Sequence, residues 1–307
     1  MSLSIPFVYH ASYSQLALPS THRFPTTKYH NLYQHALKQQ LLFEQYRHTP
    51  TPISKDTLYT VHCPQYVEQF INDALDHKAQ RRIGFPWSQE LVTRTLHAVN
   101  GTRLCAELAL DHGIAVHLTG GYHHAHYDFG SGFCIFNDLV IAARSAIDSG
   151  RADKVLIFDC DVHQGDGTAT LTQGNPDIIS CSIHCAQNFP SRKQQSDHDI
   201  ALDKGCTDKQ YLEHIQQILP YLIRIHQPDL IIYDAGVDIH QHDDLGYFSI
   251  SNLGILARDK QVISIAKMHG IPLAAVIGGG YSRSEAELTI RHSQLLVAAN
   301  ELWASQY

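Results

Sequence analysis

Apolar runs and mixed polar segments alternate regularly through the second half of the chain. Four short runs rich in Val, Ile and Leu have the length of buried β-strands: residues 154–159, 177–183, 229–236 and 271–280. Segments with apolar residues at helical spacing cover residues 207–227, 252–269 and 284–303. This alternation predicts an α/β fold with a central, mostly parallel sheet, right-handed crossovers and helices on both faces.

One more strand and helix are expected earlier in the chain. Residues 113–118 (GIAVHL) form another apolar run, and the segment from about residue 88 to residue 112 before it has helical character. No repeat, low-complexity tract or long linker divides the 307 residues, and 44% of them are hydrophobic. We therefore expect a single domain over residues 1–307 with one large core.

Polar clusters directly follow four of the predicted strands. They are TGGYHHAH from residue 119, DCDVHQGDG from residue 159, VDIHQHDD from residue 237 and GGGYS from residue 278. In open parallel sheets, ligands bind beyond the carboxyl ends of the strands. The chain has 22 histidines, so one histidine is weak evidence, but histidine-rich composition alone does not predict this placement. We expect the active site at that edge of the sheet.

The cluster from residue 159 has the residue types of a metal site. Asp161 and His163 are two positions apart, so in an extended segment they project to the same side, and Asp238 follows a neighbouring strand. Two carboxylates and an imidazole suit zinc or iron(II) better than magnesium or calcium. Three protein ligands would leave a fourth position for water, whereas a solvated loop is the alternative interpretation of the D-x-D-x-H spacing.

The adjacent His123 and His124 fit an acid/base pair better than a chelate, because neighbours in a near-extended segment point to different sides. Asp159 and Asp166 supply carboxylates that would fix their tautomers and support a positive charge. A satisfied core histidine is the alternative for either one. Tyr281 follows three glycines that permit close approach of the backbone, and its phenol would donate to a developing oxyanion.

Charge and cysteine content exclude several classes of protein. The 23 basic and 30 acidic residues are interspersed and give a net charge of −7, without the basic stripe that binds nucleic acid directly. No apolar run approaches the roughly 18 residues that cross a bilayer, and no signal-peptide pattern is present, so we expect a soluble, cytoplasmic protein. The seven scattered cysteines form neither a disulfide framework nor a thiolate zinc site.

Five motifs occur together in a specific order. They are GYHHA (121–125), SGFCIFND (131–138), D-x-D-x-H-x-G-D-G-T (159–168), AGVD (235–238) and GGGY (278–281). With them the chain resembles the zinc-dependent histone deacetylase family, which has an arginase-like α/β fold, over most of its length. HRFPTTKY near residue 25 and LGYFSISNLG after residue 244 look more like the class IV branch and its short bacterial relatives.

The resemblance implies a role for each matching position. The zinc ligands would be Asp161, His163 and Asp238. The catalytic residues would be His123 with Asp159, His124 with Asp166, and Tyr281. The acyl-lysine tunnel would have Phe133 and Phe189 as walls and Gly132 at its floor. A monovalent cation site, which relatives often fill with K⁺, would involve Asp159, Asp161, His163 and Ser182. Leu245 stands where polyamine-selective members place an acidic residue, which disfavours acetylpolyamines.

Together these features predict a metal-dependent amidohydrolase that removes acetyl or longer acyl groups from N-ε-acyl-lysine of proteins or peptides, or from a related acylated amine. We assign the general base to His124, with His123 as its electrostatic partner. We expect chains longer than acetyl to be accepted, with deacetylation as the alternative main activity.

Three alternatives belong to other classes. The first is a catalytically silent acyl-lysine reader or metal-buffering protein, which would need neither Tyr281 nor two Asp–His pairs. The second is a small-molecule deacetylase of the acetylpolyamine type. The third is an arginase-type ureohydrolase, which would need a two-metal cluster with more bridging carboxylates than these motifs offer.

Overall fold

The computed structural model describes residues 5–304. Its strands form one sheet of eight in the order β2-β1-β3-β8-β7-β4-β5-β6, and every pairing is parallel. The strands are β1 (Phe7–Val8), β2 (Arg47–His48), β3 (Ile114–His117), β4 (Val155–Asp159), β5 (Ile178–Cys185), β6 (His198–Leu202), β7 (Leu230–Asp234) and β8 (Leu273–Val276). The predicted α/β fold with a parallel sheet is confirmed.

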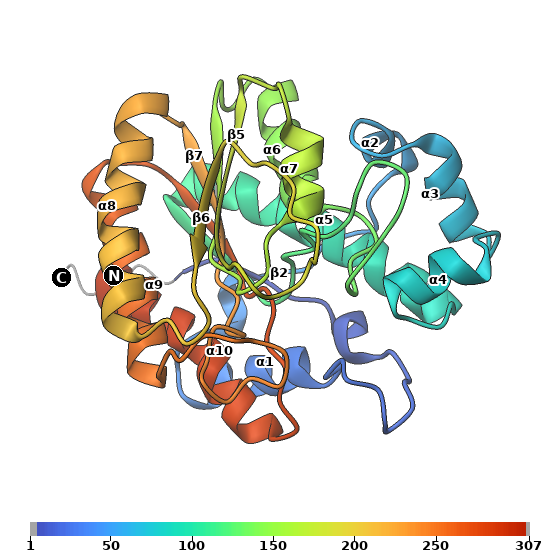
Figure 1. Cartoon of the computed structure of the whole chain (residues 1–307), viewed down its shortest axis with the longest axis horizontal. Helices are drawn as coiled ribbons and strands as arrows, with labels where there is room; N and C mark the ends of the chain where they lie inside the picture. Colours follow the sequence, from blue (N-terminus) through green and yellow to red (C-terminus); the bar gives the residue numbers. More distant parts are fainter. Residues whose placement is uncertain (1–4, 305–307) are drawn as a thin grey trace.

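Helices cover both faces of the sheet (Figure 1). They are α1 (Lys28–Lys38), α2 (Lys55–Tyr59), α3 (Pro64–Ile71), α4 (His77–Ile83), α5 (Gln89–His112), α6 (Asp138–Asp148), α7 (Asp166–Thr172), α8 (Asp208–His226), α9 (Asn252–Met268) and α10 (Glu285–Ala299). One layer contains α8, α9, α10 and α1, the other contains α5, α6 and α7, and α2 to α4 lie to one side. Among residues 5–304 no helix is long and apolar enough to span a bilayer.

The predicted elements match the structure within a few residues because their signals are local. Residues of β4 and β7 are all buried, as expected for strands covered on both faces. Helix α5 begins after Ser88, whose side chain accepts from the Leu91 amide, and ends at Gly113 with φ of 82°. The predicted helix over 284–303 ends earlier, at Ala299, and a π-helical turn over Asn300–Ala304 follows it.

The sheet register brings the polar clusters to one edge. Asp159 pairs with Ser182 on one side and with Asp234 on the other, so three side-chain positions align across β5, β4 and β7. Strand β8 lies between β3 and β7. The segments that leave β3, β4, β7 and β8 therefore emerge next to one another, although they are far apart in the sequence.

Candidate active site

Three ligand-type side chains converge beyond the ends of β4 and β7. Asp161, His163 and Asp238 are buried and each offers a ligand atom within 4.8 Å of the others. His163 Nδ1 lies 3.0 Å from Asp161 Oδ1 and 3.1 Å from Asp238 Oδ2. Burial lowers the pKa of His163, but hydrogen bonds to the two carboxylates overcome this and raise it to about 10. The same pair of carboxylates would attract a divalent cation.

The backbone fixes this three-residue group and leaves room at its centre. The amides of His163 and Gly279 each donate to Asp161 at 2.9 Å, and the amide of Val162 donates to Asp238 at 2.9 Å. A Cβ on Gly279 would lie 2.2 Å from Asp238 Oδ2 and 2.3 Å from Asp161 Oδ2. Only glycine fits there. Two carboxylates and one imidazole in such a cradle fit a divalent transition metal.

The turn that presents the tandem histidines is held by one buried carboxylate. Asp138, at the start of α6, accepts from the amide of Gly121 at 3.1 Å and from that of Tyr122 at 2.7 Å. Thr102 Oγ1 donates to the same carboxylate. The chain leaving β3 is thereby bent so that His123 and His124 both line the cavity at this edge of the sheet.

Each tandem histidine is paired with its predicted aspartate. His123 Nδ1 lies 2.7 Å from Asp159 Oδ2, and His124 Nδ1 lies 2.6 Å from Asp166 Oδ1. The two Nε2 atoms are 3.1 Å apart. Burial lowers the pKa of both rings; His123 lowers that of His124 further, to about 4, whereas Asp159 and Asp161 raise the pKa of His123 well above its usual value. These shifts favour a positive charge on His123 and a neutral ring for His124.

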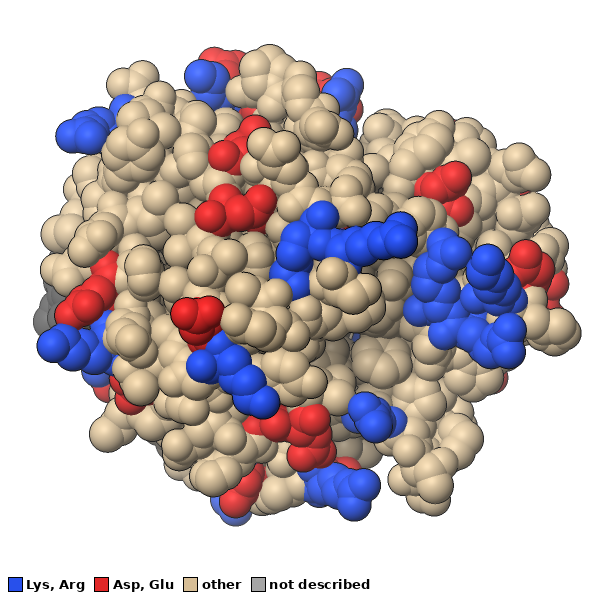
Figure 2. Space-filling view, in the orientation of Figure 1, with Lys and Arg blue, Asp and Glu red and all other residues tan. Residues whose placement is uncertain are grey.

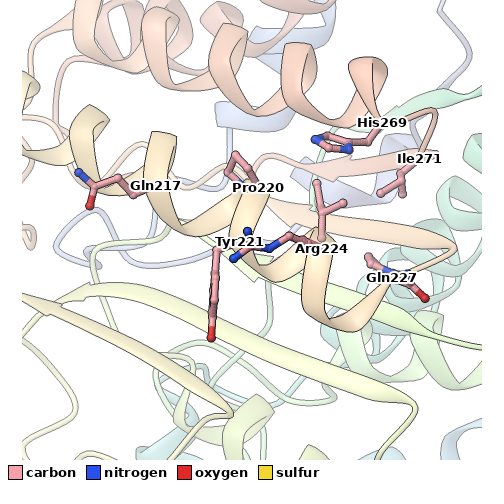
Figure 3. A pocket seen from close by; sticks show the side chains of 9 residues that line it. Gln217, Pro220, Tyr221, Arg224, Gln227, His269 and Ile271 are labelled. Carbon is pink, nitrogen blue, oxygen red and sulfur yellow. The ribbon is translucent and has the colours of Figure 1, made fainter.

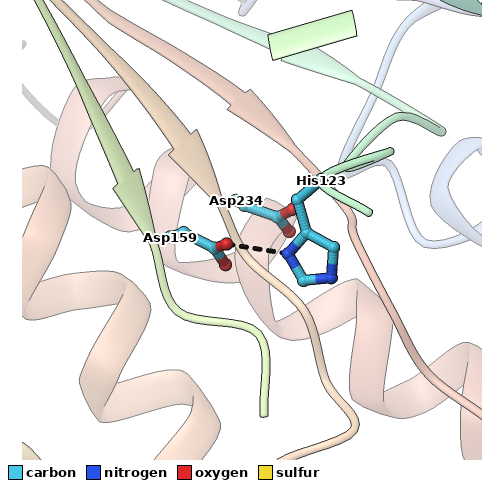
Figure 4. Close-up of side chains that lie close together, drawn as sticks. All are labelled: His123, Asp159 and Asp234. Atoms are coloured by element: carbon cyan, nitrogen blue, oxygen red, sulfur yellow. Dashed lines mark hydrogen bonds and ion pairs between the residues drawn. The ribbon is translucent and has the colours of Figure 1, made fainter. Parts of the chain in front are cut away.

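A further buried carboxylate, Asp234, lies beside the His123–Asp159 pair (Figure 4). Both of its oxygens lack a hydrogen-bond partner within the described residues. Burial raises its pKa well above the usual value, and the nearby Asp159 and Asp161 raise it further. Its surroundings therefore favour the protonated form of Asp234, which makes this second group of ligand-type residues a weaker site for a divalent cation than the first.

Tyr281 and the tandem histidines line one small cavity with Asp161 and His163, and its volume is ≈ 30 Å³. The Tyr281 amide donates to Asp243 Oδ2 at 2.7 Å, which positions the residue after β8. Burial raises the pKa of Tyr281 well above the usual value, and the negative Asp161 and Asp238 add to this. The phenol therefore keeps its proton and remains a hydrogen-bond donor.

The predicted tunnel residues lie around His124, with one exception. Gly132 and Phe133 have φ of 52° and 67° and form a turn whose amides donate to Arg82 O and Ile83 O of α4 at 3.2 and 2.8 Å. A Cβ on Gly132 would come within 2.7 Å of the His124 ring. Phe189 is 43% exposed, with its ring 4.8 Å from that of His124.

Leu245 is the exception among the tunnel residues. It lines an outer groove rather than the small cavity. Its carbonyl accepts from Asn188 Nδ2 at 3.0 Å, so it meets the loop that carries Phe189 and lies at the rim of the opening.

The residues of the predicted monovalent cation site are close in the sheet. Ser182 and Asp159 are register partners on β5 and β4, and the Asp161 amide donates to Asp159 Oδ1 at 3.0 Å. Ser182 Oγ lies 3.1 Å from His184 Nδ1. Potassium binding at this position stays a prediction.

Two residues of the site carried no assignment in the sequence, Lys28 and His126. Lys28 Nζ is buried and donates to Gly278 O at 3.1 Å and to Gly280 O at 3.4 Å, on both sides of Gly279. His126 Nε2 lies 3.2 Å from Asp166 Oδ2, so Asp166 serves two imidazoles. The spacing of histidines in GYHHAH (121–126) cannot show which ring meets which carboxylate, and Lys28 contacts residues about 250 positions away in the sequence.

Comparison with known proteins agrees with this geometry. The histone deacetylase domain matches residues 22–296. An uncharacterized protein of Picosynechococcus sp. is 44% identical over 301 residues, covering 98% of this chain and 100% of the relative. Histone deacetylase 2 of Arabidopsis thaliana is 28% identical over 303 residues, covering 92% of this chain and 76% of the relative.

A solved structure shares the fold. The crystal structure of the HDA15 HD domain matches with a TM-score of 0.77 at 19% identity, covering 99% of this chain and 96% of that one. The predicted family is confirmed, while placement in the class IV branch stays a prediction. This chain belongs to the histone deacetylase family, whose members hydrolyse amide bonds.

Proposed function

We propose that the protein is a metal-dependent deacylase acting on N-ε-acyl-lysine in proteins or peptides, or on a related acylated amine. One observation carries the proposal. His123 and His124, each paired with an aspartate, line a single small cavity together with Tyr281 and with Asp161 and His163 of the three-residue donor group. A silent acyl-lysine reader or a metal-buffering protein would need neither the paired histidines nor Tyr281.

The metal we propose is Zn²⁺, with Fe²⁺ as the alternative. Asp161, His163 and Asp238 would hold it, and the cradle at Gly279 supports this because it leaves space between the two carboxylates. When bound, the metal would supply a Lewis acid for the scissile carbonyl. We also propose that K⁺ binds near Asp159 and Ser182.

The remaining chemistry falls to the protein's own side chains. His124 is neutral, with its Nδ1–H directed at Asp166, so its Nε2 accepts a proton from the attacking water. His123 stays an imidazolium held by Asp159 and stabilises negative charge on the tetrahedral carbon's oxygen, to which Tyr281 donates. When the C–N bond breaks, the proton taken by His124 passes to the leaving amine.

Cavity size favours acetyl as the main acyl group. The cavity of ≈ 30 Å³ has about the room of one water molecule, and a long acyl chain would need much more. We therefore propose deacetylation as the main activity. Longer chains would require the Gly132–Phe133 turn to move away from α4.

One peptide series tests both the reaction and the chain length. The peptide would carry acetyl-, butyryl-, octanoyl- or myristoyl-lysine, with an N-acetylpolyamine alongside, and kcat/KM would be measured for each. We expect the highest value for acetyl-lysine. A maximum of kcat/KM at octanoyl- or myristoyl-lysine would refute the proposal that acetyl is the main acyl group. A preference for the N-acetylpolyamine would favour the small-molecule deacetylase. If metal-loaded protein hydrolyses none of these compounds, the deacylase proposal is wrong.

We also propose a reducing compartment, the cytoplasm, as the place of action. All seven cysteines are free, and six are buried. Buried thiols without a disulfide partner are typical of proteins that fold under reducing conditions. No direct contact with nucleic acid is proposed, because the chain is acidic overall.

A further inference from the structure

Two sides of the opening that leads to His124 carry positive side chains. On one side, the carbonyls of Arg82 and Ile83 at the end of α4 hold the Gly132–Phe133 turn. Arg81 lines a hollow with Phe85, whose ring lies 5.3 Å from that of Phe133, and Arg82 lies over the Phe129 ring. On the other, Lys193 Nζ donates to Asn188 O at 2.6 Å and to Pro190 O at 2.7 Å, on both sides of Phe189. The exposed Arg192 precedes Lys193.

A third side of the opening carries two further arginines. Arg23 and Arg283 line the groove beside Leu245, which measures ≈ 890 Å³. Asp244 and Glu285 line this groove as well, but Glu285 already accepts from Thr27 and Asn31. On the face drawn in Figure 2, Lys and Arg side chains gather over α4 and around the hollow beside it. We call Arg23, Arg81, Arg82, Arg192, Lys193 and Arg283 the basic rim.

The arginines of the basic rim differ from most other exposed arginines in lacking counterions. Within residues 5–304, no rim residue forms an ion pair, although the protein has seven more acidic than basic residues. The arginines that pair elsewhere on the surface are Arg47, Arg103, Arg144 and Arg151. Away from the rim, Arg224 alone among the exposed arginines of this range has no ion pair. Clustered unpaired cations at one opening indicate a ligand of opposite charge.

We propose that the basic rim binds a peptide whose residues flanking the acyl-lysine are acidic; this rests on the proposed deacylase function. Carboxylates on either side of the acyl-lysine would meet guanidinium groups of Arg81, Arg82 and Arg192, which suit bidentate pairing. The positive electrostatic potential of the basic rim would also speed the association of an acidic segment and repel a lysine-rich one. A cationic polyamine tail would be repelled in the same way.

Two peptides that differ only in flanking charge test the proposal. Both carry one acetyl-lysine, flanked by Asp and Glu in one and by Lys and Arg in the other. We expect kcat/KM to be at least about tenfold higher for the acidic peptide at low ionic strength, and the ratio to fall as salt shortens the range of the charges. Fluorescence anisotropy of the unacetylated peptides gives a binding measurement independent of hydrolysis.

Charge-reversal variants locate the effect. In Arg81→Glu/Arg82→Glu the preference should shrink severalfold, whereas in Arg224→Glu, an equally exposed and unpaired arginine outside the rim, it should persist. Thermal unfolding of both variants checks the fold, and Arg192→Glu on the opposite side of the rim replaces the double variant if that one does not fold.

Each outcome is decisive. Equal kcat/KM for the two peptides, a preference for the basic peptide, or an unchanged preference in the rim variants would overturn the inference and leave the deacylase intact. If metal-loaded protein hydrolyses neither peptide, the deacylase proposal fails, and binding decides the rim: salt-sensitive, tighter binding of the acidic peptide supports it, and equal binding overturns it.

Discussion

Two hollows at opposite edges of the sheet differ in both size and chemistry. One, of ≈ 760 Å³, lies where α8 ends and the chain enters β7 and β8, with Gln217, Tyr221, Arg224 and His269 around it (Figure 3). The other, of ≈ 30 Å³, lies at the strand ends and contains every predicted catalytic histidine and tyrosine. The larger hollow therefore has room for a ligand, whereas the smaller one brings together the side chains that can carry out a reaction.

Topology explains this difference. At the carboxyl edge, the segments after β3, β4, β7 and β8 leave adjacent strands and meet at one point. At the amino edge, the side chains come mainly from the end of one helix and point along its surface. Convergence of separate segments, rather than open volume, marks the chemical site. The following variants test this contrast, and Gln217→Ala, exposed beside the larger hollow, is their common control.

The largest effect is expected for Asp161→Ala. It removes one of the three proposed ligands, a carboxylate that also accepts hydrogen bonds from two backbone amides. The variant should therefore bind no metal, and its kcat should fall by at least about a thousandfold. Metal analysis of purified protein should give one divalent ion per wild-type chain and none in the variant. Two ions that survive dialysis, or none in the wild type, would contradict the assignment, and Gln217→Ala should keep its ion.

Tyr281→Phe should lower kcat by at least about a hundredfold while metal content and melting temperature stay unchanged, because it removes a single donor to the oxyanion. His124→Ala should have a comparable effect. Steady-state kinetics on acetyl-lysine peptide measures both. Wild-type turnover in both variants would show that this cavity is not where the chemistry takes place.

Gly132→Ala should reduce kcat/KM by about tenfold and stability by about 1 kcal/mol, since its φ of 52° disfavours any other residue. Its Cβ would also press on the His124 ring at 2.7 Å. Chemical denaturation and kinetics report the two effects separately. Gly205, also at positive φ but with nothing within 4 Å of its Cβ, is the matched control: Gly205→Ala should affect stability alone.

The smallest effect on activity is expected for Lys28→Met. The change leaves the carbonyls of Gly278 and Gly280 without their donor, which should cost about 1–3 kcal/mol of stability and loosen the backbone that holds Asp161 and Tyr281. We expect a severalfold drop in kcat with KM little changed, partly restored in Lys28→Arg. Full activity in Lys28→Met would mean that the backbone after β8 keeps its position without the two hydrogen bonds from Lys28.

The sequence predicted those strands and helices whose signal is local. Residues 154–159 and 229–236 are continuous apolar runs, and all of β4 and β7 is buried. Strands β1 and β2 have only two residues each, too few for a periodic pattern. Strand β6 lies at the edge of the sheet and alternates between half-buried and exposed positions, with only Leu202 buried and with the charged Asp199 in it, so its apolar signal is too weak to predict a strand.

For the site, spacing predicted proximity but not partners. Asp161 and His163 are two positions apart and Asp238 follows a neighbouring strand, so their convergence follows from parallel topology. Lys28 and Asp234 could not be found in this way. A buried lysine on α1 gains meaning only from carbonyls after β8, and Asp234 reads as the last residue of an apolar run until its unpartnered oxygens are seen.

The central position of β8 has a consequence for biosynthesis. Although it comes last in chain order among the described strands, β8 lies between β3 and β7, and no other described strand joins these two parts of the sheet. Until Leu273–Val276 have left the ribosome, the strand preceding His123 and those preceding Asp161 and Asp238 cannot dock through hydrogen bonds. A nascent or prematurely terminated chain that lacks β8 therefore carries two separated halves of the site, and activity begins only after this strand has been made.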